Sequence, residues 1–574
     1  MNSSIKSLVT IAAPSENIDI VVRRMAKESR KVEYAGIVVV LDSQKTLLGI
    51  VTDGDIRRAY ASDVLFSGEI SEIMVSEPIT ISEKVTEENI SLEVIRKVQL
   101  DKRHHSEWVR HVLIVNDKNQ LINIVDYFDI LQSRNNLVNR VVVFGMGYVG
   151  VTLAVSLANR GHQVTGVDVQ KSIVNSLNQG KSHVFEPGLE DMLTANLKRD
   201  SINFSTTLEV DTHQVYIVAV GTPLNSESKP DMSALINVLE VISTTLHSGD
   251  QVMLRSTVPV GVTREVVIPY IENRTNLKAG KDFYVSFAPE RTIEGNAMHE
   301  LKTLPQVVGG YSPQCVKNSV EFWSTLTPSV VRVDTIEAAE MVKLANNTFR
   351  DVSFSFANEL ALLADRYNVN SFDLINAANE GYPRNKIPLP SPGVGGYCLT
   401  KDPILFSCTS KGPRKDAVLG VSSRRVNEKA ALYPIKLIKR YAKKIQVSLS
   451  DFNILVIGVA FKGMPETTDI RGSVAIDILN NLERHVDNIF GWDAVVDSKE
   501  LKKAGFKVLD SLSTAIRCSD VILILNNHPN NVHSDMYKHS KSYRLIFDGW
   551  NQVDKSEIEK TIGMTYATMG YMTP

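Results

Sequence analysis

The sequence has little of what marks a disulfide-rich, membrane-spanning or nucleic-acid-binding protein. Its 574 residues include only four cysteines and no CxxC pair, so we expect neither a disulfide framework nor a metal site. No apolar run reaches the ~20 residues that span a bilayer, and no basic-then-apolar leader is visible. A net charge of −2 gives no attraction to nucleic acid or anionic membranes. We therefore expect a cytoplasmic protein with no nucleic-acid or membrane partner.

The first part of the chain contains a weak internal repeat. Residues 38–56 (VVVLDSQKTLLGIVTDGDI) realign on residues 113–130 (LIVNDKNQLINIVDYFDI), which places Asp55 on Asp129. Each copy is typical of a strand, a polar turn, a second strand and then a helix that starts near the aspartate. The repeat predicts two copies of one small α+β module.

At GIVTDGDIRRAY (49–60) and SEIMVSEPITIS (71–82) this segment resembles a tandem pair of CBS modules. The resemblance implies that Thr52 and Asp55 hold the ribose and phosphate of an adenine nucleotide. In the second copy Asp126 replaces Thr52, and a carboxylate there would oppose a phosphate. We expect at most one competent nucleotide site. A dimerisation or scaffold module without any ligand remains the alternative.

A nucleotide-binding pattern follows a polar, turn-rich linker at residues 132–140. Residues 141–144 form an apolar run, Gly145, Gly147 and Gly150 then open a helix, and a second strand ends at Asp168. The glycines allow a tight turn and close approach to a pyrophosphate, which the helix N-terminus attracts. Asp168, about 20 residues on, accepts from a ribose 2′-OH and repels a 2′-phosphate. The pattern predicts NAD rather than NADP.

Further motifs follow in a fixed order along the chain. They are FEPGL (185–189), VAVGTP (218–223), STVPVG (256–261), APERTIEG (288–295), EAAEMVKLANNTF (337–349), PGVGGYCLTKD (392–402) and FKG…TTDIRGS (461–473). With this ordered set, the chain from about residue 141 resembles the UDP-glucose/GDP-mannose dehydrogenase family. The resemblance implies a four-electron oxidation of a sugar C6 alcohol to a carboxylate, using two NAD. It also implies further cofactor contacts from Tyr148, Val149, Thr222 and Thr257.

The chemistry of that oxidation indicates a role for Cys398. A thiol adds to the aldehyde intermediate as a thiohemiacetal, which loses a second hydride to give a thioester that water opens. Cys398 follows a glycine-rich turn, and the neighbouring Lys401 would lower its pKa. A small buried cysteine after a loop is the ordinary alternative, and it is our interpretation of Cys315, Cys408 and Cys518.

Other catalytic groups follow from helical spacing and from the resemblance. Lys343 and Asn347 are four residues apart, so they project from one helix face and suit oxyanion stabilisation. The resemblance implies that Asp402 and Thr257 position the hydrolytic water with Lys343. It also implies that Glu290 is a late general base. Glu294, one turn further, is either a supporting carboxylate near the substrate or a solvated one.

The resemblance places the nucleotide half of the substrate on the C-terminal α/β domain. Lys462 and Arg471 match its basic pair, although the spacing between them is longer than the family pattern. Arg384 resembles an arginine that reaches across a dimer to the sugar. Gly395 and Lys401 complete the expected substrate contacts, and a homodimer or higher homo-oligomer is expected.

The motifs disagree about the sugar. APER and the bulky residue before Cys398 favour a UDP-N-acetylhexosamine, of the GlcNAc or ManNAc type, whereas LTKD favours UDP-glucose. A two-electron β-hydroxyacid dehydrogenase is less compatible, because it needs neither the cysteine nor a second α/β domain. A nucleotide-sensing protein with an inactive dehydrogenase body is the alternative outside enzymes. The CBS pair would regulate the enzyme if its ligand prefers one arrangement of the pair.

The predicted fold is α/β, with two Rossmann-like parallel-sheet domains joined by a helical dimerisation region and preceded by an α+β CBS pair. We expect the CBS pair at 1–135, the NAD-binding domain at 139–334, the helical region with the cysteine loop at 335–445, and the UDP-sugar domain at 446–574. The active site is expected between the two α/β domains.

Overall fold

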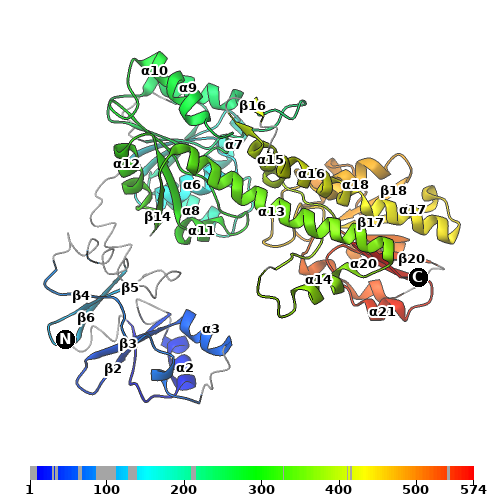
Figure 1. Cartoon of the computed structure of the whole chain (residues 1–574), viewed down its shortest axis with the longest axis horizontal. Helices are drawn as coiled ribbons and strands as arrows, with labels where there is room; N and C mark the ends of the chain where they lie inside the picture. Colours follow the sequence, from blue (N-terminus) through cyan, green and yellow to red (C-terminus); the bar gives the residue numbers. More distant parts are fainter. Residues whose placement is uncertain are drawn as a thin grey trace. The chain divides into compact units, whose positions relative to one another are not determined.

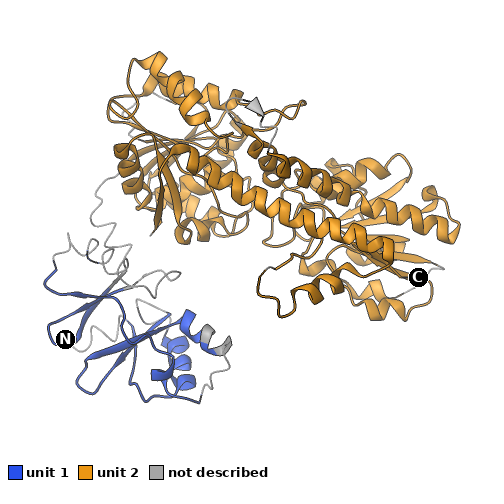
Figure 2. Ribbon diagram, in the orientation of Figure 1, with its two compact units in different colours: residues 1–137 blue, residues 138–574 orange. Residues whose placement is uncertain are grey.

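The computed structural model describes residues 9–28, 32, 36–61, 67–85, 93, 111–126, 139–208, 215–327, 329–384, 386–409, 412–413, 417–538 and 543–573. The chain forms two compact units, residues 1–137 and 138–574 (Figure 2). No described helix combines the length and apolar character needed to cross a bilayer.

The first unit contains two three-stranded sheets of the same design, each with one parallel and one antiparallel pair. Among its described residues, the strands are β1 (Thr10–Ala12), β2 (Ile37–Leu41), β3 (Leu47–Thr52), β4 (Thr80–Ser82), β5 (His111–Val115) and β6 (Leu121–Asp126), and the α-helices are α2 (Ile18–Glu28) and α3 (Asp53–Ala61).

The hairpins β2–β3 and β5–β6 have the same register. Ile37 pairs with Thr52 and His111 with Asp126, and both hairpins have an irregularity before the last residue of their first strand. This match confirms the predicted internal repeat and places Asp126 at the position of Thr52. Asp129, the expected counterpart of Asp55, lies outside the described residues.

The second unit begins with an eight-stranded sheet in the order β14-β13-β12-β11-β10-β7-β8-β9, parallel except between β12 and β13. The strands are β7 (Arg140–Phe144), β8 (Gln163–Val167), β9 (Ile202–Ser205), β10 (Val215–Val218), β11 (Gln251–Leu254), β12 (Tyr284–Phe287), β13 (Gln306–Gly310) and β14 (Val330–Val333). The helices are α6 (Tyr148–Asn159), α7 (Lys171–Asn178), α8 (Leu189–Lys198), α9 (Ser233–Thr245), α10 (Ile268–Thr275), α11 (Ala297–Thr303) and α12 (Pro313–Trp323).

The central strands β7 and β10 are buried on both faces, which explains their unbroken apolar runs. Chain order reverses between β7 and β10, because β8 and β9 continue on one side of β7 while β11 and β12 continue beyond β10. Open parallel sheets bind ligands at such a switch point, outside the carboxyl ends of the strands.

A second sheet has the order β18-β17-β19-β20-β21-β22, and only β22 is antiparallel. Its switch point lies between β17 and β19. The strands are β17 (Asn453–Ile457), β18 (Asn488–Trp492), β19 (Val521–Ile524), β20 (Arg544–Asp548), β21 (Met564–Thr568) and β22 (Tyr571–Met572), and the helices are α18 (Val474–Leu482), α19 (Ser498–Lys503), α20 (Leu512–Cys518) and α21 (Lys555–Glu559).

Between the sheets the chain is mostly helical. The elements are α13 (Ile336–Ala364), α14 (Ser371–Asn379), α15 (Tyr397–Phe406), α16 (Val418–Ala431) and α17 (Tyr433–Ile445), with short strands β15 (Cys408–Thr409) and β16 (Gly412–Pro413). The 29-residue helix α13 runs from the first sheet to the second (Figure 1). Its start packs on Gly309 of β13, and its end packs on Gly570 before β22. This arrangement confirms the predicted fold class.

Gly150 and Gly147 provide a matched pair for testing the turn after β7. A Cβ on Gly150 would lie 1.7 Å from the Gly145 carbonyl oxygen, whereas a Cβ on Gly147 would meet nothing within 4 Å. We expect Gly150→Ala to lose ~1–3 kcal/mol of stability through overpacking. Gly147→Ala should melt like the wild type in thermal unfolding. Equal melting temperatures for the two variants would contradict the described packing.

Candidate functional site

The turn after β7 fits a dinucleotide. Helix α6 starts at Tyr148, and its N-cap Gly147 makes no side-chain cap hydrogen bond, so backbone N–H groups remain to receive a phosphate. The space beside the Gly147 Cα is open, which allows a pyrophosphate to approach the backbone. These features suit the cofactor site that the sequence predicted.

Asp168 lies at the end of β8 and faces this turn. Its Oδ2 accepts from the Met146 N–H at 2.7 Å, and its Oδ1 accepts from the Gln170 N–H at 2.9 Å. Asp493 repeats the first contact at the end of β18, where its Oδ2 accepts from the N–H groups of Val459 and Ala460. Asp168 is half-buried while Asp493 is buried. Asp168 is therefore the carboxylate with an accessible edge for a ribose hydroxyl.

Two threonines occupy the loops that follow β10 and β11. The buried Thr222 donates its hydroxyl to the Thr257 carbonyl oxygen, and Thr257 itself is half-buried. The half-buried Val149 follows Tyr148 in the first turn of α6. All these residues lie at the carboxyl edge of the sheet.

The loop that precedes Cys398 is fixed to α13 through a buried polar network. Arg424 Nη1 donates to Asp351 Oδ1 at 2.7 Å and to the Val394 carbonyl oxygen at 3.2 Å. Ser423 Oγ and Asn427 Nδ2 also donate to the Asp351 carboxylate, at 2.6 and 2.8 Å. Both oxygens of the Asp351 carboxylate accept hydrogen bonds. The salt bridge with Arg424 is therefore held in a single geometry.

The turn before α18 in the C-terminal domain contacts the same loop. The Gly396 N–H donates to the Gly472 carbonyl oxygen at 3.1 Å. A Cβ on Gly395 would lie 2.5 Å from that oxygen, and Gly396 has a φ of +89°. The glycine-rich motif is therefore needed for close packing of two backbones. Helix α15, which carries Cys398, begins directly after it.

Cys398 is a free thiol whose side chain is accessible to solvent, although the surrounding protein is dense enough to desolvate its sulfur. Burial raises the pKa of the thiol, and the ammonium group of Lys343 opposes that rise. Asp402 acts in the same direction as burial, because a second negative charge disfavours a thiolate. Ionisation of Cys398 therefore depends on nearby positive charge.

Asp402 connects the two helices that meet at Cys398. It is fully buried, its Oδ1 accepts from Lys401 Nζ at 2.8 Å, and its Oδ2 accepts from Asn347 Nδ2 at 2.6 Å. Lys343 is buried one turn before Asn347 on α13. The structure thus brings together Cys398, Lys343, Asn347 and Asp402, as the sequence predicted. Lys401, expected at the substrate, forms a buried ion pair with Asp402.

The two carboxylates of the APERTIEG motif differ in their environments. Burial would raise the pKa of Glu290, but the Arg255 guanidinium, the Thr292 N–H and the Lys343 ammonium together outweigh it, so the pKa lies below its ordinary value. Arg255 Nε and Nη2 donate to Glu290 Oε2, while Glu290 Oε1 accepts from two backbone N–H groups. Burial raises the pKa of Glu294, and the carboxylate of Asp469 raises it further.

The expected nucleotide-binding cations lie beside Glu294. Lys462, just after β17 near the switch point, donates its Nζ to the Glu294 carbonyl oxygen. Arg471 is exposed, pairs with Asp469 at 2.7 Å, and lies with its Cζ 5.4 Å from the centroid of the Tyr397 ring. Both can therefore face a diphosphate outside the strand ends.

Arg384 lies apart from this group. It follows α14 on an exposed segment, where its Nη1 donates to the Tyr382 hydroxyl at 3.0 Å. Within the described residues, no hydrogen bond or ion pair joins it to the Cys398 group.

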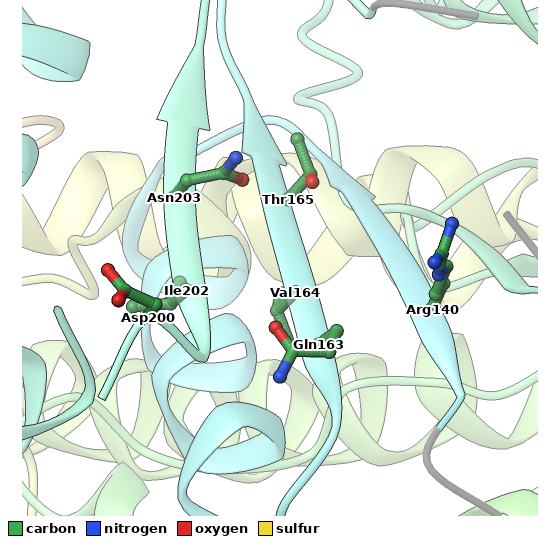
Figure 3. Close-up of a pocket in the computed structure, with 7 residues that line it drawn as sticks. All are labelled: Arg140, Gln163, Val164, Thr165, Asp200, Ile202 and Asn203. Atoms are coloured by element: carbon green, nitrogen blue, oxygen red, sulfur yellow. The ribbon is translucent and has the colours of Figure 1, made fainter. Parts of the chain in front are cut away.

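A cavity of about 400 Å³ lies at the opposite edge of the first sheet (Figure 3). Its lining residues are Arg140, Gln163, Val164, Thr165, Asp200, Ile202 and Asn203. Because Arg140, Gln163 and Ile202 begin their strands, this is the amino edge of β7, β8 and β9. It is not the cofactor site.

Three contacts of the site were not predicted from the sequence. Arg255 forms an ion pair with Glu290, the Tyr397 ring lies near both Arg471 and Lys401, and Thr467 contacts Glu294. Arg255 stands directly before the STVPVG motif and Tyr397 directly before Cys398, so adjacency to a motif was the available signal. For Thr467 the signal was the lengthened spacing between Lys462 and Arg471.

The comparisons with known proteins agree with this architecture. Residues 139–327, 337–429 and 455–555 match the NAD-binding, central and UDP-binding domain models of the UDP-glucose/GDP-mannose dehydrogenase family. Residues 5–62 and 70–136 match the CBS domain model.

Individual relatives cover most of the chain. UDP-N-acetyl-D-mannosamine dehydrogenase of Pyrococcus horikoshii is 32% identical over 434 residues, which are 75% of this chain and 99% of the relative. A solved structure of UDP-D-ManNAc dehydrogenase from that organism has a TM-score of 0.68 at 31% identity, covering 75% of this chain and 99% of the other. NDP-N-acetyl-D-galactosaminuronic acid dehydrogenase of Ralstonia nicotianae is 31% identical over 396 residues, 67% of this chain and 90% of the relative.

The domain matches and these relatives show that the chain belongs to the NAD-dependent UDP-glucose/GDP-mannose dehydrogenase family and carries CBS domains ahead of its NAD-binding domain.

Proposed function

We propose that this dehydrogenase oxidises the C6 alcohol of a UDP-N-acetylhexosamine to the carboxylate through a thioester on Cys398. The observation that carries the proposal is the convergence of Cys398, Lys343, Asn347 and Asp402 from two helices held together by buried hydrogen bonds. Each of two oxidation steps transfers one hydride to NAD, so one sugar yields two NADH.

Different side chains of the protein act in the remaining chemical steps. The alcohol first loses a hydride and a proton to give an aldehyde, and the Cys398 sulfur then adds to the carbonyl carbon. Lys343 and Asn347 stabilise the oxygen as negative charge develops on it. The thiohemiacetal loses a second hydride to become a thioester, and water opens that thioester to the acid and the free thiol. Asp402, with Thr257, positions this water.

Glu294 suits the late general base better than Glu290. The Glu290 oxygens already accept from Arg255 and from two backbone N–H groups, so an attacking water would have to displace one of them. Glu294 has a raised pKa and lies close enough to Cys398 to influence its ionisation. A base whose pKa is nearer the working pH transfers protons more effectively. In this proposal Glu290 is the supporting carboxylate.

Two independent arguments support an N-acetylhexosamine as the sugar. The APER motif and Tyr397 favour an N-acetylhexosamine, and the relatives at 31–32% identity carry the names of N-acetylmannosamine and N-acetylgalactosaminuronic acid dehydrogenases. UDP-glucose is the alternative that the LTKD motif favours. A nucleotide-sensing protein with an inactive dehydrogenase body is less well supported, because the charged groups around Cys398 remain paired.

NADH formation across a panel of UDP-sugars tests the reaction and the sugar together. We expect two NADH per sugar, with UDP-N-acetylmannosamine or UDP-N-acetylglucosamine preferred over UDP-glucose. Cys398→Ala should lower acid formation by at least about a thousandfold, because the thioester route is lost. Cys518→Ala, which removes another exposed thiol, should match the wild type. Unchanged turnover to the acid by Cys398→Ala would exclude the covalent route.

We propose that the chain is a homodimer through an exposed face of α13. Phe349, Phe356 and Leu363 are spaced by seven residues on this face, and they are 74, 56 and 47% exposed. We propose a second copy of the chain as the partner on this face. Arg384 lies away from its own Cys398 group, and in a dimer it could bind the sugar in the partner's site.

Light scattering on the protein as it elutes from a size-exclusion column tests whether the chain is a dimer. The double variant Phe349→Glu/Phe356→Glu should elute as a monomer of about 64 kDa, because like charges would face each other across the interface. Ile562→Glu alters a side chain that is 93% exposed on another face and should leave the dimer intact. A double variant with the wild-type mass would exclude this interface.

For the CBS unit we propose one adenine-nucleotide site, in the first module. The Thr52 backbone N–H and hydroxyl both donate to Asp55 Oδ2 at 2.7 Å, which orders the start of α3. Asp126 has no hydroxyl to offer at the matching position of the second module. The alternative is a scaffold that binds no ligand, and the experiment must distinguish it from a nucleotide-binding unit.

Calorimetric titration with AMP, ADP and ATP tests this site. We expect one nucleotide per chain, and Thr52→Val should weaken binding about tenfold by removing one hydrogen bond. No heat with any of the three nucleotides, together with unchanged kinetics, would leave the unit with a scaffold role alone.

A further inference from the structure

The residues that lengthen the spacing between Lys462 and Arg471 form a fixed loop. The N–H groups of Gly463 and Met464 both donate to Asn527 Oδ1 at 3.0 Å, just beyond β19. His528, which is buried, lies with its Nε2 2.9 Å from Glu466 Oε1. Residues 463–468, called the clamp loop below, are therefore anchored at the switch point of the second sheet.

The clamp loop packs on the turn that carries Glu294. A Cβ on Gly295 would lie 2.4 Å from the Glu466 carbonyl oxygen and 3.0 Å from the Pro465 side chain. On the cofactor side, the Gly295 N–H donates at 2.9 Å to both the Tyr148 hydroxyl and Glu186 Oε2. The Glu294–Gly295 turn is thus held between the two α/β domains.

Thr467 is the residue of the clamp loop that reaches the Glu294 carboxylate. It is buried, its hydroxyl donates to Glu294 Oε2 at 3.4 Å, and it accepts from the Asp469 N–H at 3.2 Å. The neighbouring Thr468 is exposed. The charged groups that act on Glu294 are Asp469, Lys462 and Arg471, and Glu294 acts in turn on the Tyr148 hydroxyl and the Cys398 thiol.

We propose that the clamp loop orients the Glu294 carboxylate for proton transfer at the thioester, and that Thr467 is a positioning residue of the reaction. This inference rests on the proposed function of Glu294. A hydroxyl that donates to a carboxylate stabilises its ionised form and fixes the direction of its free lone pairs. Burial and Asp469 oppose ionisation, so Thr467 offsets part of their effect.

The pH dependence of kcat and KM tests the proposal with matched variants. Thr467→Val keeps the shape but removes the hydroxyl, so the pKa of Glu294 should rise and the acid limb of kcat should move to higher pH. We expect kcat to fall about tenfold near neutral pH, as for one lost hydrogen bond to a charged group, with KM within about twofold. Thr467→Ser should restore the profile, and Thr468→Val should match the wild type.

An acid limb in folded Thr467→Val that coincides with the wild type would overturn the proposal. If Thr467→Val does not fold, Glu466→Ala removes an anchor of the loop without touching Glu294 and must shift the limb in the same direction. An unshifted limb in Glu466→Ala would overturn the proposal equally. Failure of the proposed function is recognised separately, because wild-type protein would then form no NADH from any UDP-sugar.

Discussion

The buried ion pair between Asp351 and Arg424 is the interaction on which the reactive geometry depends. It joins α13 to α16 and fixes the carbonyl of Val394 in the loop before Cys398. Removing one partner of such a pair costs about 3–5 kcal/mol, because the other charge stays buried without compensation. Since α13 also carries Lys343 and Asn347, a single helix sets the distance between the Cys398 thiol and these two side chains.

Loops from both α/β domains contact the segment around Cys398: Gly221 lies near Tyr397, and Gly396 packs on Phe461. Gly145 and Asp168 belong to the first sheet, and Lys462 follows the first strand of the second. An aspartate binds the loop after the first strand in both sheets, but Asp493 is buried while Asp168 keeps an accessible edge. In the C-terminal domain the contact between the aspartate and the loop stabilises the turn. In the first domain the same contact also leaves room for a ribose.

The sequence predicted the parts of the structure that local patterns encode. The α/β class, the glycine turn between β7 and α6 and the repeat in the first unit are confirmed, because strand burial, glycine conformation and hairpin register depend on nearby residues. The grouping of Lys343 and Asn347 was predictable from helical spacing. The reactive roles of these residues stay predictions.

Contacts between segments far apart in the chain could not be predicted. The ion pair of Arg255 with Glu290 depends on the pairing of β11 with β12, and the contact of Thr467 with Glu294 depends on how two domains pack; no local pattern carries either. These contacts give the two carboxylates of the APERTIEG motif different environments. Glu290 is paired with a buried cation, while Glu294 has the raised pKa that suits a base.

Rapid acid quenching of a single turnover, followed by mass spectrometry of the peptides, tests the central claim most directly. The account expects the Cys398 peptide to gain the mass of the UDP-uronyl group before acid appears, with the Cys518 peptide unchanged. Full conversion of the UDP-sugar to acid, with no adduct on Cys398 at any time point, would contradict it.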